Sequence, residues 1–156
     1  MEARAVSESQ VVMTELVLPS HTNALGTIFG GTVMSWMDIA AAICAQRHSR
    51  KTVVTAHIDD LHFVAPVFKG WVVNLKASIN YTGKTSMEVG VRIDAENPST
   101  NEIFHTASAY LTFVALGSDG KPTQVPPIKP ETPEEIRRHQ AALERQKIRL
   151  EARKRG

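Results

Sequence analysis

The sequence predicts an α+β fold, in which an antiparallel sheet of about five strands is wrapped around one long central helix. The first observation is a segment at residues 32–48 that is apolar almost throughout and long enough for a central helix. The second is a series of consecutive segments in which apolar and polar residues alternate, joined by short turns, as in an antiparallel meander. The 156 residues are enough to bury a real core as one domain.

The N-terminal part of the predicted fold is one strand followed by the helix. Residues 10–18, QVVMTELVL, are β-branched and apolar enough for a strand, which Pro19 ends. A polar, turn-rich loop, SHTNALGTIFGG, then leads into the helix. At the predicted C-terminal end of the helix, the dipole favours the positive charges of Arg47, His48 and Arg50.

Further strands are expected after the helix. Residues 52–64, TVVTAHIDDLHFV, form a long strand candidate stopped by Pro66, in which Asp59 and Asp60 indicate a β-bulge. The next strands are WVVNLKASINYT, SMEVGVRIDAE and IFHTASAYLTFVAL, and the loop ENPSTNE precedes the last. The apolar residues of the two middle strands, expected to face the core, are Leu75, Ala77, Ile79, Tyr81, Met87, Val89, Val91 and Ile93. The polar residues that alternate with them include Asn80 and Glu88.

A second helix is expected at residues 133–154, after the proline-rich linker PTQVPPIKP. Thr132 is its predicted N-cap, Pro133 its first residue, and Glu135 completes a capping box. The helix is mostly charged, and its apolar residues form only a thin stripe, Ile136, Leu143 and Leu150. We expect a solvated helix lying on its own subunit or on a neighbour, with nucleic-acid or membrane-surface contact as the alternative.

Composition narrows the function classes. Hydrophobic residues make up 42% and charged residues 22%, which is normal for a soluble globular protein. Residues 1–130 carry 10 Lys/Arg and 11 Asp/Glu, whereas residues 131–156 carry 8 Lys/Arg and 5 Asp/Glu. Residues 1–130 therefore lack the excess of positive charge that is typical of a nucleic-acid-binding domain. No apolar run reaches the ~20 residues of a membrane span, and no secretory signal is visible. The single cysteine excludes an intrachain disulfide, and we expect a cytoplasmic protein.

The single acid of the central helix is the first candidate for chemistry. Burying an unpaired carboxylate costs several kcal/mol, so Asp38 calls for an explanation. The helix begins at Gly30 and Gly31, where free backbone N–H groups and the positive end of the dipole can polarise a carbonyl. Asp38 lies two turns further on a similar face, so a base and amide donors could share one pocket, as acyl hydrolysis requires. The alternative is a structural Asp38 that hydrogen-bonds a loop or a partner helix.

Other polar residues offer weaker signals. The Asn23 amide could orient a water or hold a carbonyl, although a loop asparagine more often stabilises a turn. His57 and His62 are expected on opposite faces of their strand, and no spacing resembles a metal site. Cys44 is expected to be a small buried hydrophobe. A turn that could contact a phosphate, or be only a hairpin, consists of Gly83, Lys84, Thr85 and Ser86.

The stretch HTNALGTIFGGTVMSWMDIAA resembles the acyl-CoA thioesterases of the hotdog fold, in their bacterial and cytosolic acyl-CoA hydrolase branch. The resemblance continues through VVTAHIDDLHFVAPVFKG, YTGKTSMEV and AYLTFVAL and covers roughly residues 8–125. It implies a hotdog acyl-CoA hydrolase domain at residues 1–125. Residues 126–156, the linker and the charged C-terminal helix, then lie outside the domain.

The resemblance also implies an activity and an assembly. The expected reaction, in fatty acid metabolism, is hydrolysis of acyl-CoA to a free fatty acid and CoA, with CoA part of the substrate and no cofactor. The expected assembly is a homodimer with continuous sheets, usually a trimer of dimers, hence a homohexamer. The active site then pairs Asn23 of one subunit with Asp38 of the other.

Roles for individual residues follow from the same resemblance. Asp38 acts as general base or nucleophile, the Gly30 and Gly31 amides polarise the thioester carbonyl, and Asn23 positions water or substrate. The strand residues that line the pantetheine arm are Val54, Thr55, Ala56, His57 and Ile58. Gly83, Lys84, Thr85 and Ser86 match a turn near the CoA phosphates, which Arg47 or Lys51 could assist. A thiolate is a good leaving group, so no catalytic triad is required.

Two alternative functions are compatible with the same fold. A hotdog hydratase or dehydratase would need a catalytic histidine near the helix entry, where His21 is the only candidate and its surroundings do not fit. A non-catalytic acyl-CoA-sensing regulator or binding protein is the second rival. Such a regulator would carry a DNA-binding module, and no helix-turn-helix fits beside this domain within 156 residues.

Overall fold

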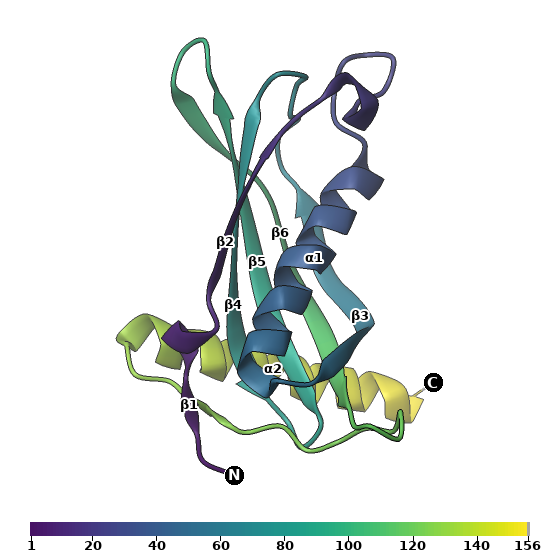
Figure 1. Ribbon diagram of the computed structural model, residues 1–156, viewed down its shortest axis with the longest axis vertical. Coiled ribbons are helices and arrows are strands. Elements are labelled where there is room, and N and C mark those ends of the chain that lie inside the picture. Colours follow the sequence, from purple (N-terminus) through teal and green to yellow (C-terminus); the bar gives the residue numbers. More distant parts are fainter. Residues whose placement is uncertain (156) are drawn as a thin grey trace.

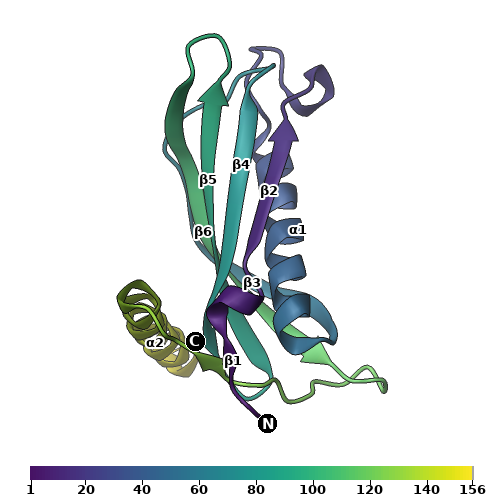
Figure 2. The same cartoon turned by 60° about the vertical axis from the view of Figure 1, so that its left-hand side comes forward.

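The computed structural model describes residues 1–155, which form one antiparallel five-stranded sheet between two helices (Figure 1). The strand order is β2 (Val11–Leu16), β4 (Val72–Thr82), β5 (Ser86–Asn97), β6 (Glu102–Leu116) and β3 (Thr52–Phe63). Helix α1 (Gly30–Ser49) lies on one face of the sheet and α2 (Pro133–Arg155) crosses the other (Figure 2). The smaller elements are β1 (Arg4–Ala5), which pairs in parallel with β7 (Ile128–Lys129), and two 3-10 turns, Val6–Glu8 and Pro19–His21. The predicted α+β hotdog fold is confirmed.

Helix α1 packs against the sheet through side chains spaced three and four residues apart. Its buried residues include Trp36, Met37, Ala40, Ala41, Cys44, Ala45 and His48. The alanines and the cysteine have small side chains, so the strands can pass close to the helix backbone. The helix ends at Arg50, which adopts a left-handed conformation with φ 57° and donates its N–H to the Gln46 carbonyl at 2.7 Å. It therefore begins two residues earlier and ends one residue later than predicted.

The alternation in the middle strands is confirmed on the core side. Seven of the eight predicted core residues of β4 and β5 are buried, and Tyr81 is half-buried. Two of the alternating polar residues, Asn80 and Glu88, are nevertheless buried as well, because α2 crosses the outer face of the sheet at this point. The alternation therefore indicates one buried face, and beneath α2 the other face is buried as well.

Strand β3 is an edge strand with the predicted irregularity. Its pairing with β6 shifts register between Thr55 and His57 and again between Asp59 and His62. Asp60 has a positive φ of 49°, as expected for a residue within a bulge. The other edge of β3 carries no strand among residues 1–155, so its backbone groups are free to pair.

Helix α2 begins as predicted and lies on its own subunit. The Thr132 hydroxyl accepts the Glu135 N–H at 3.1 Å, and a Glu135 carboxylate oxygen accepts the Thr132 N–H at 3.4 Å, which completes the capping box. Ala142 is the buried residue of the helix, whereas Ile136 and Leu150 of the apolar stripe stay about half exposed. The boundary at residues 125 and 126 stays a prediction. Within residues 1–155, neither helix is both apolar and long enough to cross a bilayer.

Candidate active site

The Asp38 carboxylate lies midway along α1, at the side facing β3. It is half-buried, and its Oδ1 accepts a 2.7 Å hydrogen bond from the Thr55 hydroxyl. No other hydrogen bond reaches this carboxylate from residues 1–155, so its second oxygen is open to water or substrate. A carboxylate held at one oxygen and open at the other can accept a proton or attack a carbonyl.

The start of α1 supplies two amide donors. The N-cap residue Phe29 makes no side-chain cap, and the Thr32 and Val33 N–H groups donate to its carbonyl at 3.1 and 3.3 Å. The Gly30 and Gly31 N–H groups have no partner within the described chain, as is usual for the first helical amides. Both glycines are exposed, so these donors can reach a bound carbonyl oxygen.

The amides and the carboxylate do not meet within one subunit. Seven residues separate Gly31 from Asp38, which corresponds to about 10 Å along the helix axis. The two groups are therefore not in direct contact within one chain. A pocket shared by the carboxylate and the amides stays a prediction.

Asn23 organises the loop that enters α1. Its Oδ1 accepts the Leu25 N–H at 2.9 Å and the Thr27 N–H at 3.2 Å, and its Nδ2 donates to the Thr27 hydroxyl at 2.8 Å. This is the turn-stabilising arrangement expected of a loop asparagine. The amide keeps one further N–H proton for a ligand, since Nδ2 carries two.

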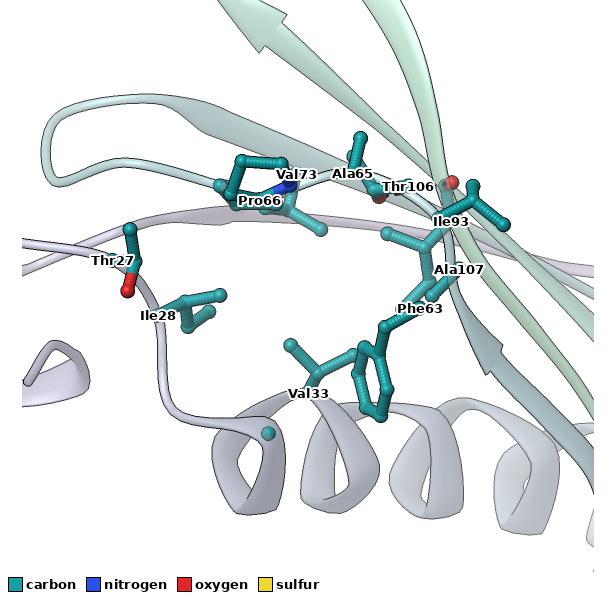
Figure 3. Close-up of a pocket in the computed structure, with 13 residues that line it drawn as sticks. Thr27, Ile28, Val33, Phe63, Ala65, Pro66, Val73, Ile93, Thr106 and Ala107 are labelled. Atoms are coloured by element: carbon teal, nitrogen blue, oxygen red, sulfur yellow. Dashed lines mark hydrogen bonds between the residues drawn. The ribbon is translucent and has the colours of Figure 1, made fainter.

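An apolar cavity of about 330 Å³ opens beside the start of α1 (Figure 3). Ile28 and Val33 lie on the helix side, and Val73, Ile93 and Ala107 come from the sheet. The Phe63 ring stands beside Val33, and a Cβ built on Gly30 would lie 3.7 Å from that ring. Sequence analysis missed this cavity, because its lining comes from segments far apart in the chain.

The predicted substrate-binding residues fall into two groups. Val54, Thr55, Ala56, His57 and Ile58 lie on β3, and Thr55 among them contacts Asp38. Residues 83–86 form the turn between β4 and β5, at the end of the sheet where α1 ends and far from its N-terminus (Figure 1). In that turn the Gly83 N–H donates to the Ser86 carbonyl at 2.9 Å, and Lys84 is exposed. Arg47 donates to the Gln10 carbonyl at 2.8 Å.

Cys44 and His48 of α1 are both buried side chains. Cys44 is buried, as expected, and burial raises the pKa of its thiol to about 11. His48 is buried too, and its Nε2 lies 2.6 Å from the Pro126 carbonyl. Burial is the main reason that the pKa of His48 is below its ordinary value.

Comparison with known proteins agrees with this fold. A family model described as the thioesterase superfamily matches residues 25–101. An uncharacterized acyl-CoA thioester hydrolase of Bacillus subtilis, YkhA, is 44% identical over 144 residues, which cover 92% of this chain and 84% of that protein. A solved apo-hexameric acyl-CoA thioesterase superposes with a TM-score of 0.93 at 40% identity, covering 97% of both chains.

An acyl-CoA hydrolase from Staphylococcus aureus has been solved in complex with butyryl coenzyme A, coenzyme A and coenzyme A disulfide. It superposes with a TM-score of 0.88 at 38% identity, covering 98% of this chain and 95% of that one. The same enzyme has been solved as three variants, in which an aspartate, a threonine or an asparagine is replaced by alanine.

Proposed function

The chain belongs to the thioesterase superfamily, and on that premise we propose that it hydrolyses acyl-CoA to a free fatty acid and CoA. The observation that carries the proposal is the Asp38 carboxylate, the one acid of α1, held at one oxygen by Thr55 at 2.7 Å and open at the other. The relatives named as acyl-CoA hydrolases support the substrate class. The alternatives are an acyl-CoA-sensing regulator or binding protein and a hotdog hydratase, and neither requires an oxygen of Asp38 to be open.

The proposed site is shared between two subunits. Asp38 and Thr55 are flanked by apolar side chains that a single chain leaves exposed, Met34, Ile39 and Val54. Together with the free edge of β3, they form a surface that a second copy can cover by extending the sheet. Asn23 of the other subunit would then face Asp38, together with the Gly30 and Gly31 amides to which the Asn23 loop leads. The hexameric thioesterase supports a homo-oligomer, for which we propose a trimer of dimers.

The chemistry needs only these groups. With Asp38 as general base, a water loses a proton to the carboxylate and its oxygen adds to the thioester carbon. The Gly30 and Gly31 N–H groups hold the developing oxyanion, and Asn23 positions the water or the substrate. The C–S bond then breaks, and CoA leaves as a thiolate that takes up the proton. In the alternative, a carboxylate oxygen of Asp38 adds to the thioester carbon, and the C–S bond breaks as the CoA thiolate leaves. Water then hydrolyses the resulting anhydride to the fatty acid and the free Asp38 carboxylate.

Substrate contacts are proposed for three places. The acyl group enters the apolar cavity beside Gly30, whose lining suits a hydrocarbon chain. Val54, Thr55, Ala56 and Ile58 line the pantetheine arm, whereas His57 of the same predicted segment faces α2. Gly83, Lys84, Thr85 and Ser86 contact the CoA phosphates. CoA takes part as substrate and product, no further cofactor is proposed, and a cytoplasmic location stays a prediction.

The test is hydrolysis of a panel of acyl-CoAs from acetyl to palmitoyl, followed by release of free thiol. We expect Asp38→Asn to lower turnover by about 100-fold or more and Asn23→Ala to lower it as well. Asp94→Asn, which removes a surface carboxylate paired with Arg92, is the matched control. Turnover at the wild-type rate in an assembled Asp38→Asn variant would contradict the proposal. Acyl-CoA binding without wild-type turnover would favour the sensor.

A further inference from the structure

Strand β3 changes the face to which its side chains point just after Thr55. In a regular strand, residues 55, 57 and 59 share one face. Here Thr55 pairs with Phe113 and His57 with Thr112, so Ala56 is an extra residue in β3. Thr55 consequently faces Asp38 on α1, whereas His57 and Asp59 face α2 on the other side of the sheet. The bulge therefore lets β3 contact Asp38 of α1 through Thr55 and α2 through the residues that follow.

Two arginines of α2 hold the segment of β3 that follows the bulge. Arg149 forms an ion pair with Asp59, and its Nη2 also lies 3.9 Å from a carboxylate oxygen of Glu88 on β5. Arg145 donates to Glu88 at 2.6 Å, and its guanidinium lies 3.6 Å from the centre of the Tyr110 ring. Tyr110 is the β6 residue that pairs with Asp59. Through these contacts, α2 binds three neighbouring strands of the sheet, β3, β6 and β5.

The network is buried on the side of Glu88 and open to water at Asp59. The side chains of Arg149 and Glu88 are 15% and 2% exposed, and that of Asp59 is 39% exposed. Burial opposes the charge of Arg145, but hydrogen bonds and the charge of Glu88 raise the pKa of the guanidinium above its ordinary value. Removing Arg149 takes away the ion pair that joins Asp59 to α2, so the segment of β3 that follows the bulge is held less firmly.

We propose that Arg149 is a positioning residue for the hydrolysis, which acts through Asp59 and the bulge of β3 to present the Thr55 hydroxyl to Asp38. The inference rests on the proposed catalytic role of Asp38. It gives the C-terminal helix a function in the active site, although the helix lies on the opposite face of the sheet (Figure 2). His57, whose Nε2 lies 3.5 Å from the Asp59 carboxylate, belongs to the same segment.

The first test separates kcat from KM with the best acyl-CoA of the panel. Arg149→Gln is expected to lower kcat about tenfold with KM within about twofold, because a displaced Thr55 weakens the orientation of Asp38. Arg149→Lys keeps the charge toward Asp59 and is expected to restore most of the rate. Arg137→Gln removes a charge that pairs with Glu134 of the same helix and is expected to match the wild type. If Arg149→Gln does not fold, Asp59→Asn is expected to show the same loss.

The second test is a double-mutant cycle with Thr55→Val. If Arg149 acts through the Thr55 hydroxyl, Arg149→Gln lowers kcat less than about twofold once that hydroxyl is gone. Losses that multiply, or an unchanged kcat in folded Arg149→Gln and Asp59→Asn variants, would overturn the inference. Asp38→Asn in the same series distinguishes a failure of the proposed function from a failure of the positioning role. Full activity of Asp38→Asn refutes the proposed function, whereas an inactive Asp38→Asn beside a fully active Arg149→Gln refutes only the positioning role.

Discussion

Replacing Thr55 by valine tests whether the hydrogen bond to Asp38 is needed for catalysis. The substitution keeps the β-branched shape and removes only the hydroxyl that donates to the carboxylate at 2.7 Å. A hydrogen bond to a charged group contributes about 1.5–3 kcal/mol, which corresponds to about 10- to 150-fold in rate if it is needed in full at the transition state. We therefore expect kcat to fall about tenfold or more, measured by thiol release at saturating acyl-CoA.

Two controls accompany that experiment. Thr55→Ser keeps a hydroxyl and is expected to retain most of the activity. Thr52→Val removes an exposed threonine from the same strand, for which no side-chain hydrogen bond exists within residues 1–155, and is expected to leave kcat unchanged. Thr55 is exposed in the single chain, so its replacement should change the melting temperature little. A Thr55→Val rate within twofold of the wild type, beside an inactive Asp38→Asn, would refute the reasoning.

Three further predictions concern buried groups. Because the pKa of the Cys44 thiol is about 11 and the side chain is buried, a disulfide reagent at pH 8 should detect no thiol in the native protein and one per chain in denaturant. Because burial lowers the pKa of His48, the unfolded chain binds more protons than the native protein below about pH 6.5. The free energy of unfolding should therefore fall from pH 7 to pH 5, and it should fall less steeply in His48→Gln. Leu111→Ala, at a fully buried site in β6, should lower the free energy of unfolding by about 2–5 kcal/mol in urea titrations, against a change within about 0.5 kcal/mol for the exposed Ile103→Thr.

Much of the fold could be predicted because local patterns and tertiary packing agree. The alternation around Leu75 and Val89 predicts which face of the sheet is buried against α1, regardless of what covers the opposite face. Asp59 and Asp60 indicate the bulge in β3 without knowledge of which strand pairs with it. The burial of Glu88 could not be predicted in this way. A glutamate among alternating residues indicates a solvated face, and only the path of α2, set by contacts far apart in sequence, brings Arg145 over it.

Sequence patterns indicate the candidate site residues one by one, but they do not indicate how these residues are arranged. An acid within an apolar helix indicates Asp38, and a glycine pair at the helix start indicates open amides. Thr55 contacts Asp38 on α1 while His57 and Asp59 face α2, because the inserted Ala56 changes the face of the side chains that follow it, and no local pattern indicates this insertion. The apolar cavity depends on how Phe63 and Val33 come together at the helix start, and no local pattern in either segment indicates that.

The position of Asp38 also explains how the fold tolerates an acid in its central helix. The sheet covers one side of α1, and the uncovered side includes Met34, Asp38 and Ile39, at helical spacing. In the single chain the carboxylate therefore keeps contact with water and a hydroxyl donor, and the desolvation cost of a buried charge is largely avoided. A helix that is apolar all round in sequence but covered on one side only leaves an apolar strip for another surface. If a second copy covers it, Asp38 enters a drier site already paired with Thr55 and close to a substrate carbonyl, where a carboxylate is a more effective base or nucleophile than in water.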